Sequence, residues 1–150
     1  DLNLTHTSNR NYKFTEKVTI KSADPTQKAV VNELFIRGAT NVTISDLKFD
    51  YTGVQGADTQ SWQIGDPFFI ENGAGITLDR LVIDGHSNSA GFGAGTGLRV
   101  KNSANVTISN TEMVNFKVAM NLWNSSDITV ENNVIRKMNH DALFIGGVKN

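Results

Sequence analysis

Apolar and polar residues alternate in a short segment that recurs five times along the chain, each time as apolar, threonine, apolar. In an extended strand the two apolar side chains face one side and the threonine faces the other. Consecutive copies begin 24, 34, 30 and 22 residues apart. Repeats of this length that are built from short strands indicate a solenoid, in which each repeat forms one coil. The copies are Val18-Thr19-Ile20, Val42-Thr43-Ile44, Ile76-Thr77-Leu78, Val106-Thr107-Ile108 and Ile128-Thr129-Val130.

Each coil is expected to contain two further short strands, because β-branched residues are frequent in the segments between the repeats. The second strand follows the first after a polar turn, and the third precedes the next repeat. Inward positions of the second strand are Leu47 and Phe49, Leu81 and Ile83, Thr111 and Met113, and Asn133 and Ile135. Those of the third are Leu34 and Ile36, Phe68 and Ile70, Leu98 and Val100, Met120 and Leu122, and Leu143 and Ile145.

A column of glycine and asparagine marks one turn of every coil. These residues tolerate a positive φ, so the column predicts a left-handed bend that is repeated in each coil. Its members are Gly38, Asn72, Asn102, Asn124 and Gly147. Coils stacked at roughly 4.8 Å each cover the edge of the neighbouring coil. We therefore predict an all-β fold, a right-handed parallel β-helix, since parallel crossovers are nearly always right-handed.

The prediction amounts to about three short strands per coil and roughly five to six coils. Residues 1–16 are polar and weakly alternating, and we interpret them as part of a preceding coil. The chain begins with Asp1 and ends at Asn150, directly before the position of the next repeat, and no amphipathic cap helix is visible. We therefore interpret residues 1–150 as a single segment of a longer solenoid with both caps missing.

Composition excludes several classes of function. The net charge of −1 gives no general electrostatic reason to expect nucleic acid or an anionic membrane as a partner. No stretch approaches the roughly 18 consecutive apolar residues of a membrane span. The absence of cysteine excludes a disulfide scaffold and cysteine-based metal or redox chemistry.

Two coils carry insertions at the same turn, between the second and third strands. The insertions lie within residues 51–66 and 85–97, and they are expected to form one wall on one side of the solenoid. Insertions gathered on one face of a repeat protein often form its binding face. The alternative is a surface embellishment without a function.

The outward positions of the third strands lie next to that wall and predict a groove for a sugar-acid polymer. Aromatic rings stack on sugar faces, and Arg99 and Lys101 are suited to pair with carboxylates. The expected substrate-binding residues are Tyr51, Trp62, Phe69, Phe92, Asn121, Trp123 and Phe144. The alternative is that the inserts or a neighbouring subunit cover these aromatic residues.

Asp50 and Asp84 each fall eight residues after the start of a repeat and are expected to stack in successive coils. Paired carboxylates bind calcium, share a proton or carry out acid–base chemistry. The nearby His86 is a candidate base. The alternative is that both aspartates only cap turns.

His140 and Asp141 stand at the entry to the last third strand. A histidine next to a carboxylate is a candidate catalytic pair, although side chains at such a place more often bond to the turn backbone. No phosphate-binding loop and no zinc-ligand spacing is present in the sequence.

The repeats in NVTISN and DITVENNVIRKMNHDALFIGG, with VTIKSADPTQKAVV before them, resemble bacterial right-handed parallel β-helix proteins of the pectin-lyase-like superfamily. The resemblance covers about residues 17–150. It implies a polysaccharide lyase, a mannuronan C5-epimerase, a glycoside hydrolase, a phage tailspike or a non-catalytic surface protein. Of the epimerases' Tyr-Gly-Phe-Asp-Pro-His-like motif the chain has only Asp66-Pro67-Phe68 and His140-Asp141, so no catalytic residue is carried over.

Two functional hypotheses follow. In the first, a secreted or surface-exposed β-helix binds and modifies an anionic polysaccharide by removing the proton next to a uronate carboxylate. Arg99 and Lys101 neutralise that carboxylate, and His86 or His140 is the base. In the second, the β-helix is a non-catalytic part of a phage tailspike or adhesin, assembled as a homotrimer that buries Phe35, Phe69 and Phe144. Both hypotheses place the protein outside the cell or on a cell or virion surface, and calcium is the candidate cofactor.

Overall fold

The computed structural model describes residues 1–51, 67–87, 91, 93 and 95–147. These residues form strands and turns only, so none of them forms a helix long and apolar enough to cross a membrane. The strands are β1 (Leu2–Thr5), β2 (Lys13–Lys21), β3 (Ala29–Val31), β4 (Leu34–Arg37), β5 (Thr40–Ser45), β6 (Leu47–Asp50), β7 (Phe68–Glu71), β8 (Ala74–Asp79), β9 (Val82–Asp84), β10 (Thr96–Lys101), β11 (Ala104–Ser109), β12 (Glu112–Val114), β13 (Val118–Trp123), β14 (Ser126–Glu131), β15 (Val134–Arg136) and β16 (Asp141–Gly146).

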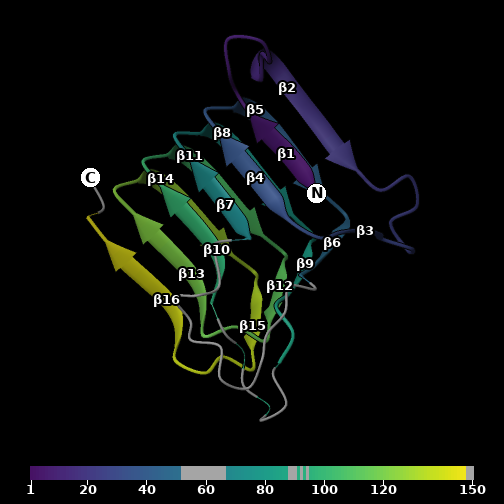
Figure 1. The fold of residues 1–150 in the computed structure, drawn as a ribbon, viewed down its shortest axis with the longest axis vertical. Coiled ribbons are helices and arrows are strands. Elements are labelled where there is room, and N and C mark those ends of the chain that lie inside the picture. Colours follow the sequence, from purple (N-terminus) through teal and green to yellow (C-terminus); the bar gives the residue numbers. More distant parts are fainter. Residues whose placement is uncertain (52–66, 88–90, 92, 94, 148–150) are drawn as a thin grey trace.

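The strands form three parallel sheets that wrap around one core, as the stacked ribbons show (Figure 1). Sheet 1 has the order β1-β4-β7-β10-β13-β16, sheet 2 has β14-β11-β8-β5-β2, and sheet 3 has β15-β12-β9-β6-β3. Each coil adds one strand, or rung, to each sheet. The predicted parallel β-helix with three strands per coil is therefore confirmed for the described residues.

The register is the one that the repeats predict. Thr43 pairs with Thr19 on one side and with Thr77 on the other, and Thr107 continues the column to Thr129. The apolar neighbours of these threonines point inward, and Val42, Ile44, Ile76 and Ile108 are fully buried. Burial of each such side chain contributes about 1.5–3 kcal/mol, so the stacked apolar columns hold the coils together.

Every residue of the predicted glycine and asparagine column has a positive φ, between 48° at Asn124 and 65° at Gly38. Buried serines complete the same corner by bonding the backbone of the adjacent coil. Ser103 Oγ accepts a hydrogen bond from Gly73 N at 3.1 Å, and Ser125 Oγ accepts one from Ser103 N at 3.1 Å. The backbone N–H groups of Gly73 and Ser103, which lie in the turn and outside the strands, thereby have hydrogen-bond partners.

Residues 1–31 form one coil, and residues 1–16, which we interpreted as part of a preceding coil, supply its β1 and the start of its β2. Its strands β1, β2 and β3 pair with β4, β5 and β6. A small antiparallel bridge between Thr7 and Arg10 lengthens the connection from β1 to β2. Because of this extra length, the spacing between β1 and β2 differs from that in the later coils, and the repeat pattern of the sequence does not reveal β1 as a part of this coil.

Both predicted insertions lie between a strand of sheet 3 and the next strand of sheet 1. Residues 52–66 are outside the described part of the chain. In the second insertion, Ser87 and Gly93 form an antiparallel bridge. Gly93 lies so close to the backbone of Asn115 and Phe116 that a Cβ atom there would overlap it. Gly93 therefore packs against the turn of the next coil.

Candidate functional site

The outward face of sheet 1 carries two columns of polar and aromatic side chains. One column runs Asn3, Phe35, Phe69, Arg99, Asn121 and Phe144, and the other runs Thr5, Arg37, Glu71, Lys101, Trp123 and Gly146. Two hollows of about 140 and 250 Å³ lie on this face. We call their lining the sheet 1 groove: Arg37, Phe69, Ile70, Glu71, Arg99, Lys101, Asn121, Trp123 and Phe144.

Arg99 and Lys101 lie at the centre of the groove and line both hollows. They are two residues apart on β10, so their side chains project from the same face of the strand. On the neighbouring strand β7, Glu71 is the Cα partner of Lys101, with 3.8 Å between its Oε1 and Lys101 Nζ. Among the described residues, the side chains at the centre of the groove therefore carry a net positive charge.

Aromatic pairs flank these cations on both sides along the solenoid axis. The rings of Phe35 and Phe69 have centroids 5.0 Å apart, and the Arg37 guanidinium lies 5.0 Å from the Phe69 centroid. Towards the C-terminal end, Trp123 and Phe144 lie in nearly parallel planes, 6° apart, with centroids separated by 6.2 Å. These two rings are 41% and 44% exposed and so present aromatic surface to a ligand.

The indole of Trp123 is held in place by the next coil. It lies over Gly146, the Cα partner of Trp123, where a Cβ atom would overlap the ring. The Asn124 amide, oriented so that both of its ends are bonded, accepts a hydrogen bond from Trp123 Nε1 at 3.1 Å and donates one to the carbonyl of Gly147 at 3.1 Å. Sequence reasoning missed this arrangement, although a glycine opposite a tryptophan in the predicted register was a signal for it.

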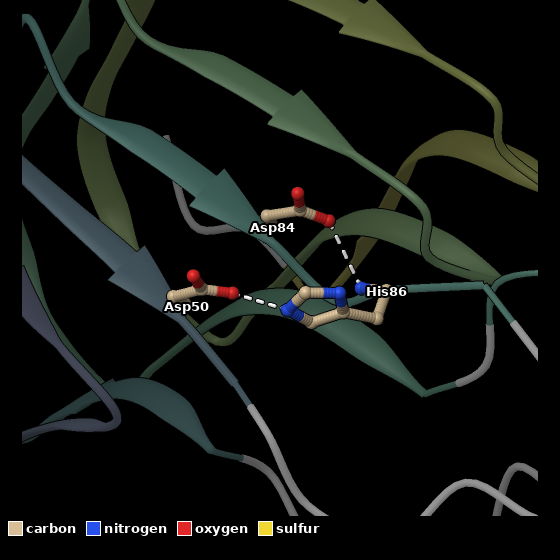
Figure 2. Close-up of side chains that lie close together, drawn as sticks. All are labelled: Asp50, Asp84 and His86. Atoms are coloured by element: carbon tan, nitrogen blue, oxygen red, sulfur yellow. Dashed lines mark hydrogen bonds and ion pairs between the residues drawn. The ribbon is translucent and has the colours of Figure 1, made fainter.

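A second cluster lies where two neighbouring strands of sheet 3 end (Figure 2). Asp50 on β6 and Asp84 on β9 are Cα partners, as predicted, and Nε2 of His86 contacts Oδ1 of Asp50. Lys48 Nζ lies 2.9 Å from Asp50 Oδ2. Hydrogen bonds from Lys48 and then from His86 keep the pKa of the Asp50 carboxyl below its ordinary value, so this side chain is an anion at neutral pH.

Asp84 caps a turn, which was the alternative to a metal-binding or catalytic role for Asp50 and Asp84. Its Oδ1 accepts hydrogen bonds from the backbone N of His86 at 2.9 Å and from Asn115 Nδ2 at 2.8 Å. His86 has a φ of 56°, and this bond stabilises the bend. Asp50 bonds side chains of Lys48 and His86 instead. Lys48 was missed, although residues two apart on a strand share a face.

Asp50, Asp84 and His86 could hold a metal ion, because one ligand atom from each lies within 4.8 Å of the others. A cation there would have to displace Lys48 and His86 from Asp50. Calcium takes six to eight oxygen ligands, of which these two carboxylates supply only a part. Calcium binding therefore stays a prediction.

If that prediction is correct, millimolar calcium raises the melting temperature of the protein, because a ligand that binds only the folded state stabilises it. Asp50→Asn removes a charged ligand and is expected to abolish the rise. Differential scanning fluorimetry with calcium, with a chelator and with magnesium as the control measures the effect. Equal shifts in the wild type and in Asp50→Asn would show that calcium binds elsewhere or not at all.

The remaining predicted residues lie in other places. His140 Nδ1 is 2.7 Å from Asp141 Oδ2, at the entry to β16, where both side chains are exposed. Tyr51 packs against the core, with its ring edge-on to that of Phe68 at 6.2 Å. Trp62 and Phe92 lie outside the described residues.

The five predicted catalytic residues thus fall on three parts of the fold. His86 belongs to the cluster at the end of sheet 3, and Arg99 and Lys101 belong to the sheet 1 groove. His140 and Asp141 form a pair at the turn before β16. The groove is the largest of these assemblies and the one that joins cationic and aromatic side chains.

Comparison with known proteins agrees with this architecture. The model of a family described as the right-handed β-helix region matches residues 32–150. No curated protein and no solved structure matches the chain. The match confirms the predicted right-handed parallel β-helix and is broadly consistent with the pectin-lyase-like superfamily. A domain of this kind is compatible with a carbohydrate-active or carbohydrate-binding protein and identifies no reaction.

Proposed function

We propose that this chain, which belongs to the right-handed β-helix family, binds an acidic polysaccharide along the outward face of sheet 1. The observation that carries the proposal is the order of side chains along the groove. Arg99 and Lys101 lie between the Phe35–Phe69 pair and the Trp123–Phe144 pair. Such an order suits a polymer whose rings stack on aromatic residues and whose carboxylates pair with cations.

The dimensions of the groove suit a chain of several sugars. Rungs of a parallel sheet are spaced by about 4.8 Å, so Phe69 and Phe144, three rungs apart, are about 14 Å from each other. A polymer that runs across the strands meets the two aromatic pairs in turn, with the cations between them. The sheet supports all of these side chains on a rigid backbone, which lowers the entropy lost on binding.

The charge of the groove is local. The whole chain has a net charge of −1, whereas the described lining of the groove holds the three cations Arg37, Arg99 and Lys101 and the one carboxylate of Glu71. A cationic groove on a nearly neutral protein favours an anionic ligand at this face.

A finer proposal is that the bound polymer is also modified, by a lyase or C5-epimerase reaction. Such a reaction removes the proton on the carbon next to a uronate carboxylate, and Arg99 and Lys101 would neutralise that carboxylate. His86, which contacts Asp50, is one candidate base, and His140, which contacts Asp141, is the other. Ultraviolet absorbance of unsaturated uronate detects a lyase, and NMR of the polymer detects an epimerase.

The competing proposal is a non-catalytic surface protein, such as part of a phage tailspike or adhesin. The exposed Phe144 and Trp123 favour it, because a homotrimer would cover such rings. Under both proposals the protein works outside the cell or on a cell or virion surface, where its polysaccharide partner lies. Analytical ultracentrifugation distinguishes a trimer from a monomer.

The binding proposal is tested by replacing both central cations, as Arg99→Gln with Lys101→Gln. We expect binding of polygalacturonate or alginate to weaken by about 10- to 100-fold, since each charged hydrogen bond contributes about 1.5–3 kcal/mol before screening by salt. Isothermal titration calorimetry measures the affinity. Arg136→Gln with Lys137→Gln removes the same charge at the end of β15 and serves as the matched control. Equal losses in the two variants would refute the proposed groove.

A further inference from the structure

The carboxylate of Glu71 lies inside the groove and faces a cation on each side. Its Oε2 is 3.0 Å from Arg37 Nε, and its Oε1 is 3.8 Å from Lys101 Nζ. The register of sheet 1 produces this arrangement, because Arg37 on β4 and Lys101 on β10 are the Cα partners of Glu71. A negative group at this place therefore has two cations with which to pair.

These ion pairs are accessible to solvent and to a ligand. The side chains of Arg37, Lys101 and Glu71 are 50%, 36% and 24% exposed. Ion pairs at such exposure are screened by water and salt and contribute little to stability, so they exchange partners readily. The carboxylate of a uronate residue has the same charge and the same planar shape as the carboxylate of Glu71. It can therefore replace Glu71 beside either cation.

We infer that Glu71 is an internal competitor for the carboxylates of the polysaccharide and thereby sets the affinity and charge selectivity of the groove. This inference rests on the proposed function. A polymer gains the attraction of Arg37 and Lys101 only when Glu71 gives them up. Glu71 therefore lowers the affinity for polymers that carry carboxylates and leaves the affinity for neutral polymers unchanged.

A role of Glu71 in merely holding its partners in place would have the opposite consequence. Removal of its charge would then release Arg37 and Lys101 and weaken binding. Arg37 has a second support, because its guanidinium lies 5.0 Å from the centroid of the Phe69 ring. Its place beside the groove thus does not depend on Glu71 alone. The sign of the change in affinity separates the two roles.

The experiment uses Glu71→Gln, which keeps the size of the side chain and an oxygen that accepts from Arg37. We expect this variant to bind polygalacturonate about 3- to 10-fold more tightly than the wild type at low ionic strength, with a smaller gain at high salt. Affinity for the fully methyl-esterified polymer is expected to stay the same. Glu112→Gln is the matched control, because Glu112 is paired with Arg136 on sheet 3, outside the groove.

Isothermal titration calorimetry at two salt concentrations gives the affinities. Unchanged or weaker binding of polygalacturonate by Glu71→Gln would overturn the inference, and so would an equal gain in Glu112→Gln. The proposed function would survive that result if the wild type binds and the Arg99→Gln, Lys101→Gln variant binds about 10- to 100-fold more weakly, as expected above. Failure of the wild type to bind any acidic polymer would overturn the proposed function and this inference with it.

Discussion

Replacing Phe68 with alanine is expected to lower the free energy of unfolding by about 3–5 kcal/mol, the usual cost of removing a large aromatic side chain from a packed core. Phe68 is the first residue of β7 and is fully buried. Its ring lies edge-on to those of Phe49 at 5.8 Å and Phe116 at 6.1 Å, and Tyr51 packs on it at 6.2 Å. Removal of the Phe68 ring would leave a cavity where the chain enters and leaves the inserted turns.

The next residue along the strand provides a matched control. Phe69 points outward into the groove, so Phe69→Ala is expected to cost less than about 1 kcal/mol of stability and to weaken binding of the polymer instead. Urea unfolding followed by circular dichroism measures stability, and calorimetry measures binding. The interpretation of the core would be wrong if Phe68→Ala and Phe69→Ala lowered the stability equally.

The core and the turns could be predicted because the same requirement recurs in every coil. A single Val-Thr-Ile segment is a weak signal, whereas five copies in one register define a sheet. The same holds for the left-handed column from Gly38 to Gly147, in which each position needs a residue that tolerates a positive φ. Repetition turned local preferences of low specificity into a prediction of the whole fold.

Other turns could not be predicted, because contacts between coils override residue preference. Arg80 has a φ of 51°, in a conformation that arginine rarely adopts. It is held there by the buried carboxylate of Asp46, whose two oxygens accept from Arg80 Nε at 2.8 Å and from an Arg80 terminal nitrogen at 2.9 Å. Such a pair depends on the side chains of two coils, and the sequence of either coil alone contains no sign of it.

The candidate site was likewise predictable where strand alternation decides the direction of a side chain, and unpredictable where contacts between coils decide it. Strand alternation was sufficient to place Arg99, Lys101 and Trp123 on one outward face. Tyr51 was expected in the groove because it begins the first insertion, whereas it continues the inward alternation of Leu47 and Phe49 and packs against the core. The contacts that Glu71 and Trp123 make with neighbouring rungs required side-chain positions across several coils.

Trp123→Ala is expected to reduce affinity for the polysaccharide by about 30-fold, equivalent to about 2 kcal/mol, as is typical when a central aromatic residue is removed from a binding surface. The loss should be similar for acidic and methyl-esterified polymers, because stacking on a ring does not depend on the charge of the sugar. This separates the tryptophan from Arg99 and Lys101, whose removal should affect only the acidic polymer. Isothermal titration calorimetry with both polymers measures the two patterns.

Gly146→Ala tests whether the position of the ring matters as well as its presence. The new Cβ atom would occupy space that the indole of Trp123 now fills, so the ring must move and its hydrogen bond to Asn124 must break. We expect Gly146→Ala to lose most of the affinity that Trp123→Ala loses, and the fluorescence of Trp123, measured in a Trp62→Phe background, to shift. Trp123→Phe keeps a ring without the Nε1 donor and should lie between the wild type and Trp123→Ala. Wild-type affinity in Gly146→Ala, with a shifted fluorescence spectrum, would show that the ring acts without being held in place by Gly146 and Asn124.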